Sequence, residues 1–253
     1  KVGSMFELHA QRPLSARPHA TSGAMSAGAD LDAWLLGAVK SEGQLMRFPA
    51  PSVPGGEVCL RLFQGDPAQL PGSDSGGVLW EAAEVLARWL CERGRSELLP
   101  HGAAALELGC GCGLVALALA ALGAEVVATD AQPRVVYGVA AANVAANRGA
   151  LLALVHLRVL RWGDEADDAM LREIVIGPLV ASAGPSLVVG ADLLYDPEGR
   201  AGLAVLLRRL AVLRVLDEFK VILAWQVRHR TAEDAFFSGL TDVFESREVH
   251  AEA

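Results

Sequence analysis

The stretch that decides the fold is LELGCGCGL, Leu106–Leu114. An apolar run, Ala104–Leu108, leads into it, and an apolar helical segment, Gly113–Leu122, follows it. Gly109 and Gly111 lack Cβ atoms, so the chain can turn sharply there and a ligand can approach the backbone. A strand, a glycine turn and a helix in this order predict a ligand site at the carboxyl end of a sheet strand, although a plain tight turn fits the same pattern.

The rest of the chain repeats this alternation of short apolar runs and helical patterns. We expect strands at Ala104–Leu108, Glu125–Thr129, Ala153–Leu160, Ser186–Ala191, Val221–Trp225 and Val243–Val249, and a half-buried strand at Glu57–Gly65. We expect helices at Asp30–Val39, Val78–Gly94, Gly113–Leu122, Pro133–Asn147, after Asp164, Pro197–Leu213 and Thr231–Ser238. Strands alternating with helices predict an α/β protein: a Rossmann-like, doubly wound, mostly parallel sheet with helices on both faces.

Composition and cysteine spacing exclude several classes of function. The net charge of −8 argues against a nucleic-acid-binding protein, which would present a basic face. No apolar run reaches the roughly 20 residues that a membrane span requires. Cys110 and Cys112 are separated by one residue, which suits neither a C-x-x-C redox pair nor a zinc site. We therefore expect no bound metal.

An acid at the end of the next strand points to the ligand. Asp130 closes the run VVATD, where its carboxylate can accept hydrogen bonds from both hydroxyls of a ribose. Together with the glycine turn, it predicts an adenosine-containing ligand. A nicotinamide dinucleotide is disfavoured, because the fingerprint G-x-G-x-x-G would need glycine where this chain has Leu114.

These motifs resemble those of a known family. LELGCGCGL followed by VVATD is similar to the S-adenosylmethionine motif of the class I, seven-β-strand methyltransferases. Farther along, the chain resembles the methyltransferase 16 family of protein lysine methyltransferases in SGGVLWEAAEVLARWL, in Asn143-Val-Ala-Ala-Asn147, in RWGDE and in GADLLYDPE. The resemblance covers roughly Gly77 to Val249. It implies S-adenosylmethionine as the cofactor, S-adenosylhomocysteine as the product and a protein lysine as the methyl acceptor.

The resemblance also implies which residues form the site. The residues expected to bind the cofactor are Trp80, Gly109, Cys110, Gly111, Asp130, Trp162 and Ala191, with Cys110 contributing only its main chain. The two asparagines, Asn143 and Asn147, are left out of the site, because in the family such a pair is structural as often as functional. Arg228 and Arg230 are similar to a basic segment of the family, and both contact with the substrate protein and a plain surface role stay open.

The catalytic residues are expected in ADLLYDPE. Asp196 and Pro197 are explained by the start of a helix, which leaves Asp192 and Tyr195 to be explained. The resemblance places both around the methyl acceptor. Asp192 can orient a lysine amine and Tyr195 can fix a second N–H direction, because methyl transfer depends on alignment. We assign Asp192 to orientation first and to proton acceptance second; a solvated strand end is the alternative.

Other functions and the surroundings of the protein stay open at this point. The alternatives are methylation of a small amine or of another side chain, and a non-catalytic module that binds S-adenosylmethionine. We expect a monomer with no nucleic-acid or membrane partner. We expect it in the cytoplasm, with the nucleus possible, and residues 9–29, with two Arg, three Ser and no acid, weakly resemble an organelle transit segment.

The expected domain organisation is simple. Residues 1–56 form a partly flexible N-terminal extension, and residues 57–253 form a single methyltransferase domain. The family's sheet ends in a sixth and a seventh strand, whereas the last run here, Val243–Val249, is only the sixth. We therefore expect the final strand to be absent, which would leave a sheet edge open to association.

Overall fold

The fold is described from a computed structural model of the chain. It describes residues 4–10, 42–65, 75–98, 104–163, 171, 185–213 and 220–249. The helices expected at Asp30–Val39 and after Asp164 lie outside these ranges.

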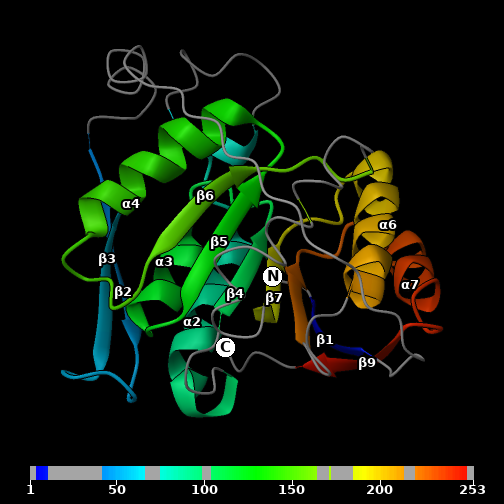
Figure 1. Ribbon diagram of the computed structural model, residues 1–253, viewed down its shortest axis with the longest axis horizontal. Coiled ribbons are helices and arrows are strands. Elements are labelled where there is room, and N and C mark those ends of the chain that lie inside the picture. The colour runs from blue at the N-terminus through cyan, green and yellow to red at the C-terminus, as the bar shows by residue number, and fades with distance from the viewer. Residues whose placement is uncertain are drawn as a thin grey trace.

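The centre of the molecule is a sheet that the described residues build from seven strands, six of them close to the predicted runs (Figure 1). Their order across the sheet is β6 (Val155–Val159), β5 (Glu125–Asp130), β4 (Ala104–Leu108), β7 (Pro185–Ala191), β8 (Lys220–Trp225), β1 (Ser4–Ala10) and β9 (Phe244–Val249). The first five run parallel, and every residue of β4 is buried. The order turns back between β4 and β7, so a ligand site is expected outside their carboxyl ends.

The seventh strand comes from the beginning of the chain. β1 lies between β8 and β9 and is antiparallel to both, so that Met5 faces Ala224 on one side and Val249 on the other. The expectation that the sheet lacks a seventh strand is therefore wrong. Ser4–Ala10, which we had assigned to an N-terminal extension, belongs to the sheet because its apolar residues Met5 and Leu8 are buried in the two cores.

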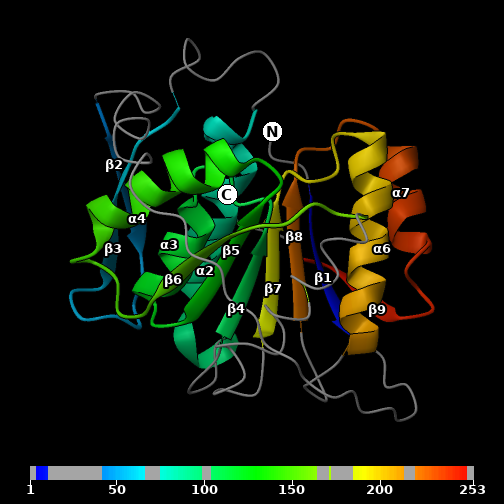
Figure 2. The same ribbon diagram turned by 45° about the horizontal axis from the view of Figure 1, so that its top comes forward.

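Helices cover both faces of this sheet, as predicted (Figure 2). One face packs against α2 (Glu81–Leu98) and α3 (Leu114–Ala121), and the other packs against α6 (Pro197–Leu213) and α7 (Arg230–Ser238). The helix expected at Pro133–Asn147 begins with a π-helical turn, Val135–Ala140 (η2), and continues as α4, Ala141–Asn147. The described helices are all too short or too polar to cross a membrane.

A small hairpin lies beside the main sheet and is fastened to it by side chains. It consists of β2 (Gln44–Pro49) and β3 (Glu57–Leu62), of which only β3 was predicted. Asn147 accepts a hydrogen bond from the backbone N–H of Arg61 and donates one to its carbonyl, both at 2.7 Å. Asn143 does the same with Phe63 and also donates to the carbonyl of Cys112. The asparagine pair thus acts as a strand-like partner for the edge of β3 and fastens it to the glycine turn.

Candidate active site

The glycine turn after β4 is closed tightly by its neighbours. Gly109 has φ +61°, and a Cβ atom there would lie 2.5 Å from Cδ2 of Leu193. Gly111 has φ +51°, and a Cβ atom there would lie 3.0 Å from the carbonyl oxygen of Gly76. Since both the positive φ and the missing space require glycine, these residues hold bare backbone at the carboxyl edge of the sheet. A short 3-10 turn, η1 (Ser75–Gly77), lies against it.

Asp130 is held by backbone N–H groups at the end of β5. Its Oδ2 accepts a hydrogen bond from the N–H of Gly111 at 3.1 Å, and its Oδ1 accepts one from the N–H of Gln132 at 3.1 Å. Each carboxylate oxygen has two lone pairs. Asp130 can therefore brace the glycine turn and still accept hydrogen bonds from a ligand.

A cavity of about 540 Å³ opens at this edge of the sheet and gathers nearly all of the predicted site. Its lining includes Trp80, Gly109, Gly111, Asp130, Trp162, Ala191, Asp192 and Tyr195. Cys110 is the exception: its side chain is buried, and its N–H already donates to the carbonyl of Thr129. Burial also raises the pKa of the Cys110 thiol well above its usual range, so it is an inert packing group.

The lining also contains residues that the sequence analysis did not assign to the site. They are Ser75, Gly76, Ala131, Gln132, Arg161, Leu193, Asp196, Glu198 and Gly199. Six of these nine lie inside the motifs SGGVLWEAAEVLARWL, RWGDE and GADLLYDPE, so the motifs themselves were the signal. Asp196, as expected, stabilises the start of α6, because its Oδ2 accepts a hydrogen bond from the N–H of Gly199 at 2.6 Å.

Asp192 occupies a strained position directly after β7. Its φ of +58° is rare for a residue other than glycine, and its N–H donates to the carbonyl of Ala224 at 2.7 Å. The residue is buried, so a charged carboxylate there needs partners. Backbone strain of this kind concentrates at functional sites, where the surrounding structure enforces it.

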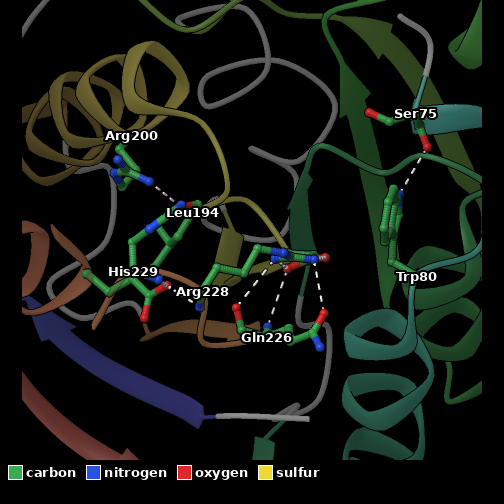
Figure 3. A network of polar contacts seen from close by, with 9 residues as sticks. Ser75, Trp80, Leu194, Arg200, Gln226, Arg228 and His229 are labelled. Carbon is green, nitrogen blue, oxygen red and sulfur yellow. Dashed lines mark hydrogen bonds and ion pairs between the residues drawn. The ribbon is translucent and has the colours of Figure 1, made fainter. Parts of the chain in front are cut away.

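The partner of Asp192 is Arg228, which lies in the loop after β8. The two guanidinium nitrogens of Arg228 donate to the two carboxylate oxygens, at 2.5 and 2.7 Å, and the N–H of Gln226 donates to Oδ1 at 3.3 Å. This two-bond pairing raises the pKa of the Arg228 guanidinium. Figure 3 shows Arg228 beside Gln226 in this network. For Arg228 we expected either contact with the substrate protein or a surface role; its pairing with Asp192 was not predicted.

Arg228 also contacts the aromatic ring of Trp80. The guanidinium carbon lies 5.9 Å from the centre of the indole ring, within the range of a cation–π contact. The indole N–H donates to the carbonyl of Ser75 at 3.0 Å, as Figure 3 shows. Trp80 is 43% exposed and lines the cavity.

A buried acid lies beneath the glycine turn. Glu107 of β4 is almost fully buried, and its carboxylate accepts a hydrogen bond from the N–H of Ala116 at 2.9 Å. Burial raises its pKa to about 8, although the bond from Ala116 opposes this. Its carbonyl accepts the hydroxyl of Thr129, which ties β4 to β5 at this level.

The charges of the cavity suit a cationic ligand. Among the described residues, four carboxylates, those of Asp130, Asp192, Asp196 and Glu198, and one cation, Arg161, line it; Arg228 pairs with Asp192 from outside this lining, and the remaining acids still outnumber the cation. Within the described ranges, no group of three or more His, Cys, Asp or Glu side chains is placed to hold a metal ion.

The sequence matches a known family and two curated relatives. The family described as lysine methyltransferase matches residues 68–243. The zebrafish (Danio rerio) protein N-lysine methyltransferase METTL21A is 31% identical over 173 residues, which cover 68% of this chain and 70% of the zebrafish protein. The mouse (Mus musculus) protein of the same name is also 31% identical, over 176 residues and with the same coverage. The chain therefore belongs to the lysine methyltransferase family.

Proposed function

We propose that the cavity at the carboxyl edge binds S-adenosylmethionine and that Asp192 and Tyr195 present a protein lysine to its methyl group. The observation that carries this proposal is the meeting of a glycine turn, a ribose-type acid and a buried, strained carboxylate in a single cavity. When bound, S-adenosylmethionine supplies an electrophilic methyl group on a positively charged sulfonium.

The residues present fit this cofactor. The bare backbone of Gly109 and Gly111 leaves room for close approach, and Asp130 can accept the ribose hydroxyls. Trp162 packs against the position where a Gly109 Cβ would lie, so its indole can form one wall for a flat base. Trp80 lines the same cavity, and the surplus of carboxylates favours a cation.

Asp192 serves to hold and orient the substrate amine. Both of its oxygens accept N–H bonds from Arg228, and Oδ1 also accepts the N–H of Gln226, so Oδ2 keeps a second lone pair for an N–H of the lysine. We assign proton removal to solvent, because Tyr195, which lines the same cavity, is 55% exposed and water can therefore reach this part of it. Arg228 is then a positioning residue that fixes the plane of the Asp192 carboxylate.

The partner is accordingly a protein that presents a lysine side chain. The zebrafish and mouse relatives are named protein N-lysine methyltransferases, which supports this acceptor over a small amine. We also propose that the protein works as a monomer in the cytoplasm. Sedimentation and imaging of the tagged protein test these two points.

The experiment that tests the function is transfer of a labelled methyl group. The protein is incubated with labelled S-adenosylmethionine and a cell extract, and the labelled residues are identified by mass spectrometry. We expect label on lysine with the wild type, a large loss with Asp192→Asn, and no loss with Asp234→Asn on the exposed face of α7. Label on small molecules alone, or no label at all, would overturn the proposal.

A further inference from the structure

A second hollow of about 480 Å³ lies beside the cofactor cavity and has the opposite charge. We call it the basic hollow; its lining includes Tyr195, Arg200, His229 and Arg230. No acidic residue of the described ranges lines it, whereas four carboxylates line the neighbouring cavity. Tyr195 lines both spaces and therefore marks the boundary between them.

The positive charges of the basic hollow come from two helices that begin side by side. Arg200, in the first turn of α6, donates one hydrogen bond to the carbonyl of Leu194 at 2.6 Å (Figure 3). This bond holds the side chain against the loop that carries Tyr195. A guanidinium has five N–H donors, so most of those of Arg200 remain for a ligand.

The positive charge of Arg230 is not paired with any residue that the structure describes. It begins α7 and is exposed, and its side chain makes no hydrogen bond or ion pair with any described residue. The nearby Glu233 does not neutralise it, because that carboxylate is buried and accepts the N–H groups of Arg228 and His229. The chain as a whole carries a net charge of −8, whereas the described residues that line this hollow are all basic or neutral. The positive charge of the hollow therefore differs from the overall charge of the protein.

We propose that the basic hollow binds a carboxylate of the substrate protein, on an Asp or Glu close to the target lysine in its chain. The proposal rests on the proposed function, because the carboxylate in the basic hollow would be a sequence neighbour of the lysine that Asp192 holds. An acidic cavity and a basic hollow that share Tyr195 match a segment whose lysine and carboxylate lie within about four residues, since four extended residues span roughly 14 Å. A segment with a second basic residue in place of the acid would meet like charges and be rejected.

The test combines site mapping with a charge reversal. Methylated lysines are mapped in extract labelled by the wild type, by Arg230→Glu, and by the control Arg148→Glu. Arg148 is an exposed arginine just after α4, at the opposite end of the sheet strands. We expect wild-type sites to have an Asp or Glu within about four residues, and Arg230→Glu to lose roughly tenfold or more of their labelling, mainly through a higher KM. Arg148→Glu should label as the wild type does, and all three proteins should gain equal thermal stability from S-adenosylhomocysteine.

A charge swap on the substrate completes the test. Replacing the mapped Asp or Glu by Lys should weaken methylation by the wild type and restore methylation by Arg230→Glu. Labelled lysines without a neighbouring acid, or an unchanged rate for Arg230→Glu, would overturn the inference while leaving the lysine methyltransferase function intact. Loss of labelling after phosphatase treatment of the extract would overturn it in favour of a phosphate. If the wild type labels no lysine at all, the proposed function itself fails.

Discussion

The buried acid under the glycine turn makes stability depend on pH in a direction that can be measured. Glu107 keeps its proton in the folded protein up to a pH of about 8, whereas an ordinary glutamate releases it near 4.5. Between these values the folded state binds more protons than the unfolded state, so raising the pH favours unfolding. Each pH unit in this window lowers the free energy of unfolding by about 1.4 kcal/mol. From pH 4.5 to pH 7 the loss is on the order of 3 kcal/mol.

Glu107→Gln removes this dependence without removing the hydrogen bond. The amide oxygen of glutamine can still accept the N–H of Ala116, but the side chain no longer titrates. Urea unfolding at several pH values from about 5 to about 8 gives the free energy of unfolding of both proteins. We expect the free energy of unfolding of the variant, relative to that of the wild type, to rise by about 1.4 kcal/mol for each unit by which the pH is raised.

A matched control separates burial from the chemical change. Glu245→Gln makes the same substitution on β9, where the side chain is exposed, and should leave the pH dependence of stability unchanged. If the difference in unfolding free energy between Glu107→Gln and wild type is constant across the pH range, the folded protein does not hold the proton and the reasoning is refuted.

Three further changes test other parts of the structure. Asn143→Ala removes three hydrogen bonds to the backbone and should cost about 2–4 kcal/mol in urea unfolding; a loss below about 0.5 kcal/mol would contradict its fastening role. Gly109→Ala places a Cβ 2.5 Å from Leu193 at a positive φ, so thermal stabilisation by S-adenosylhomocysteine should disappear, and retained stabilisation would exclude the glycine turn from the site. Although burial opposes it, the bond from Arg247 and the charge of Lys220 lower the pKa of Glu7, so its stabilisation exists above its unfolded pKa and is lost as the pH falls through the folded one. In urea unfolding the wild type should therefore be more stable than Glu7→Gln at neutral pH, and this difference should shrink as the pH falls and Glu7 takes up its proton; a difference that stays constant on acidification would contradict this.

Local patterns in the sequence are enough to predict most of the residues that the structure brings together around one cavity. The glycine turn and Asp130 lie within one strand–helix–strand unit, and the acceptor motif around Asp192 follows a single strand. Each can be recognised from residues adjacent in the chain, and the topology of a parallel sheet then brings their carboxyl ends together.

Features made by distant residues could not be predicted in this way. Arg228 is separated by 36 positions from Asp192, and no spacing rule indicates that a guanidinium will meet a particular carboxylate. The basic hollow depends on how the first turns of α6 and α7 face each other. The contact of the asparagine pair with Arg61 and Phe63, 80 or more positions away in the chain, likewise required the structure.

Placing β1 between β8 and β9 sets the order in which the protein can be assembled. A chain leaves the ribosome with its N-terminal part first, so Ser4–Ala10 emerges long before either neighbouring strand. Until then both edges of the segment are unpaired and the apolar side chains of Met5 and Leu8 are exposed, which invites aggregation. Contacts between residues 240 positions apart also form slowly. We therefore expect β1 to insert late in folding, after β8 and β9 have been made, and to protect the edges of both strands only then.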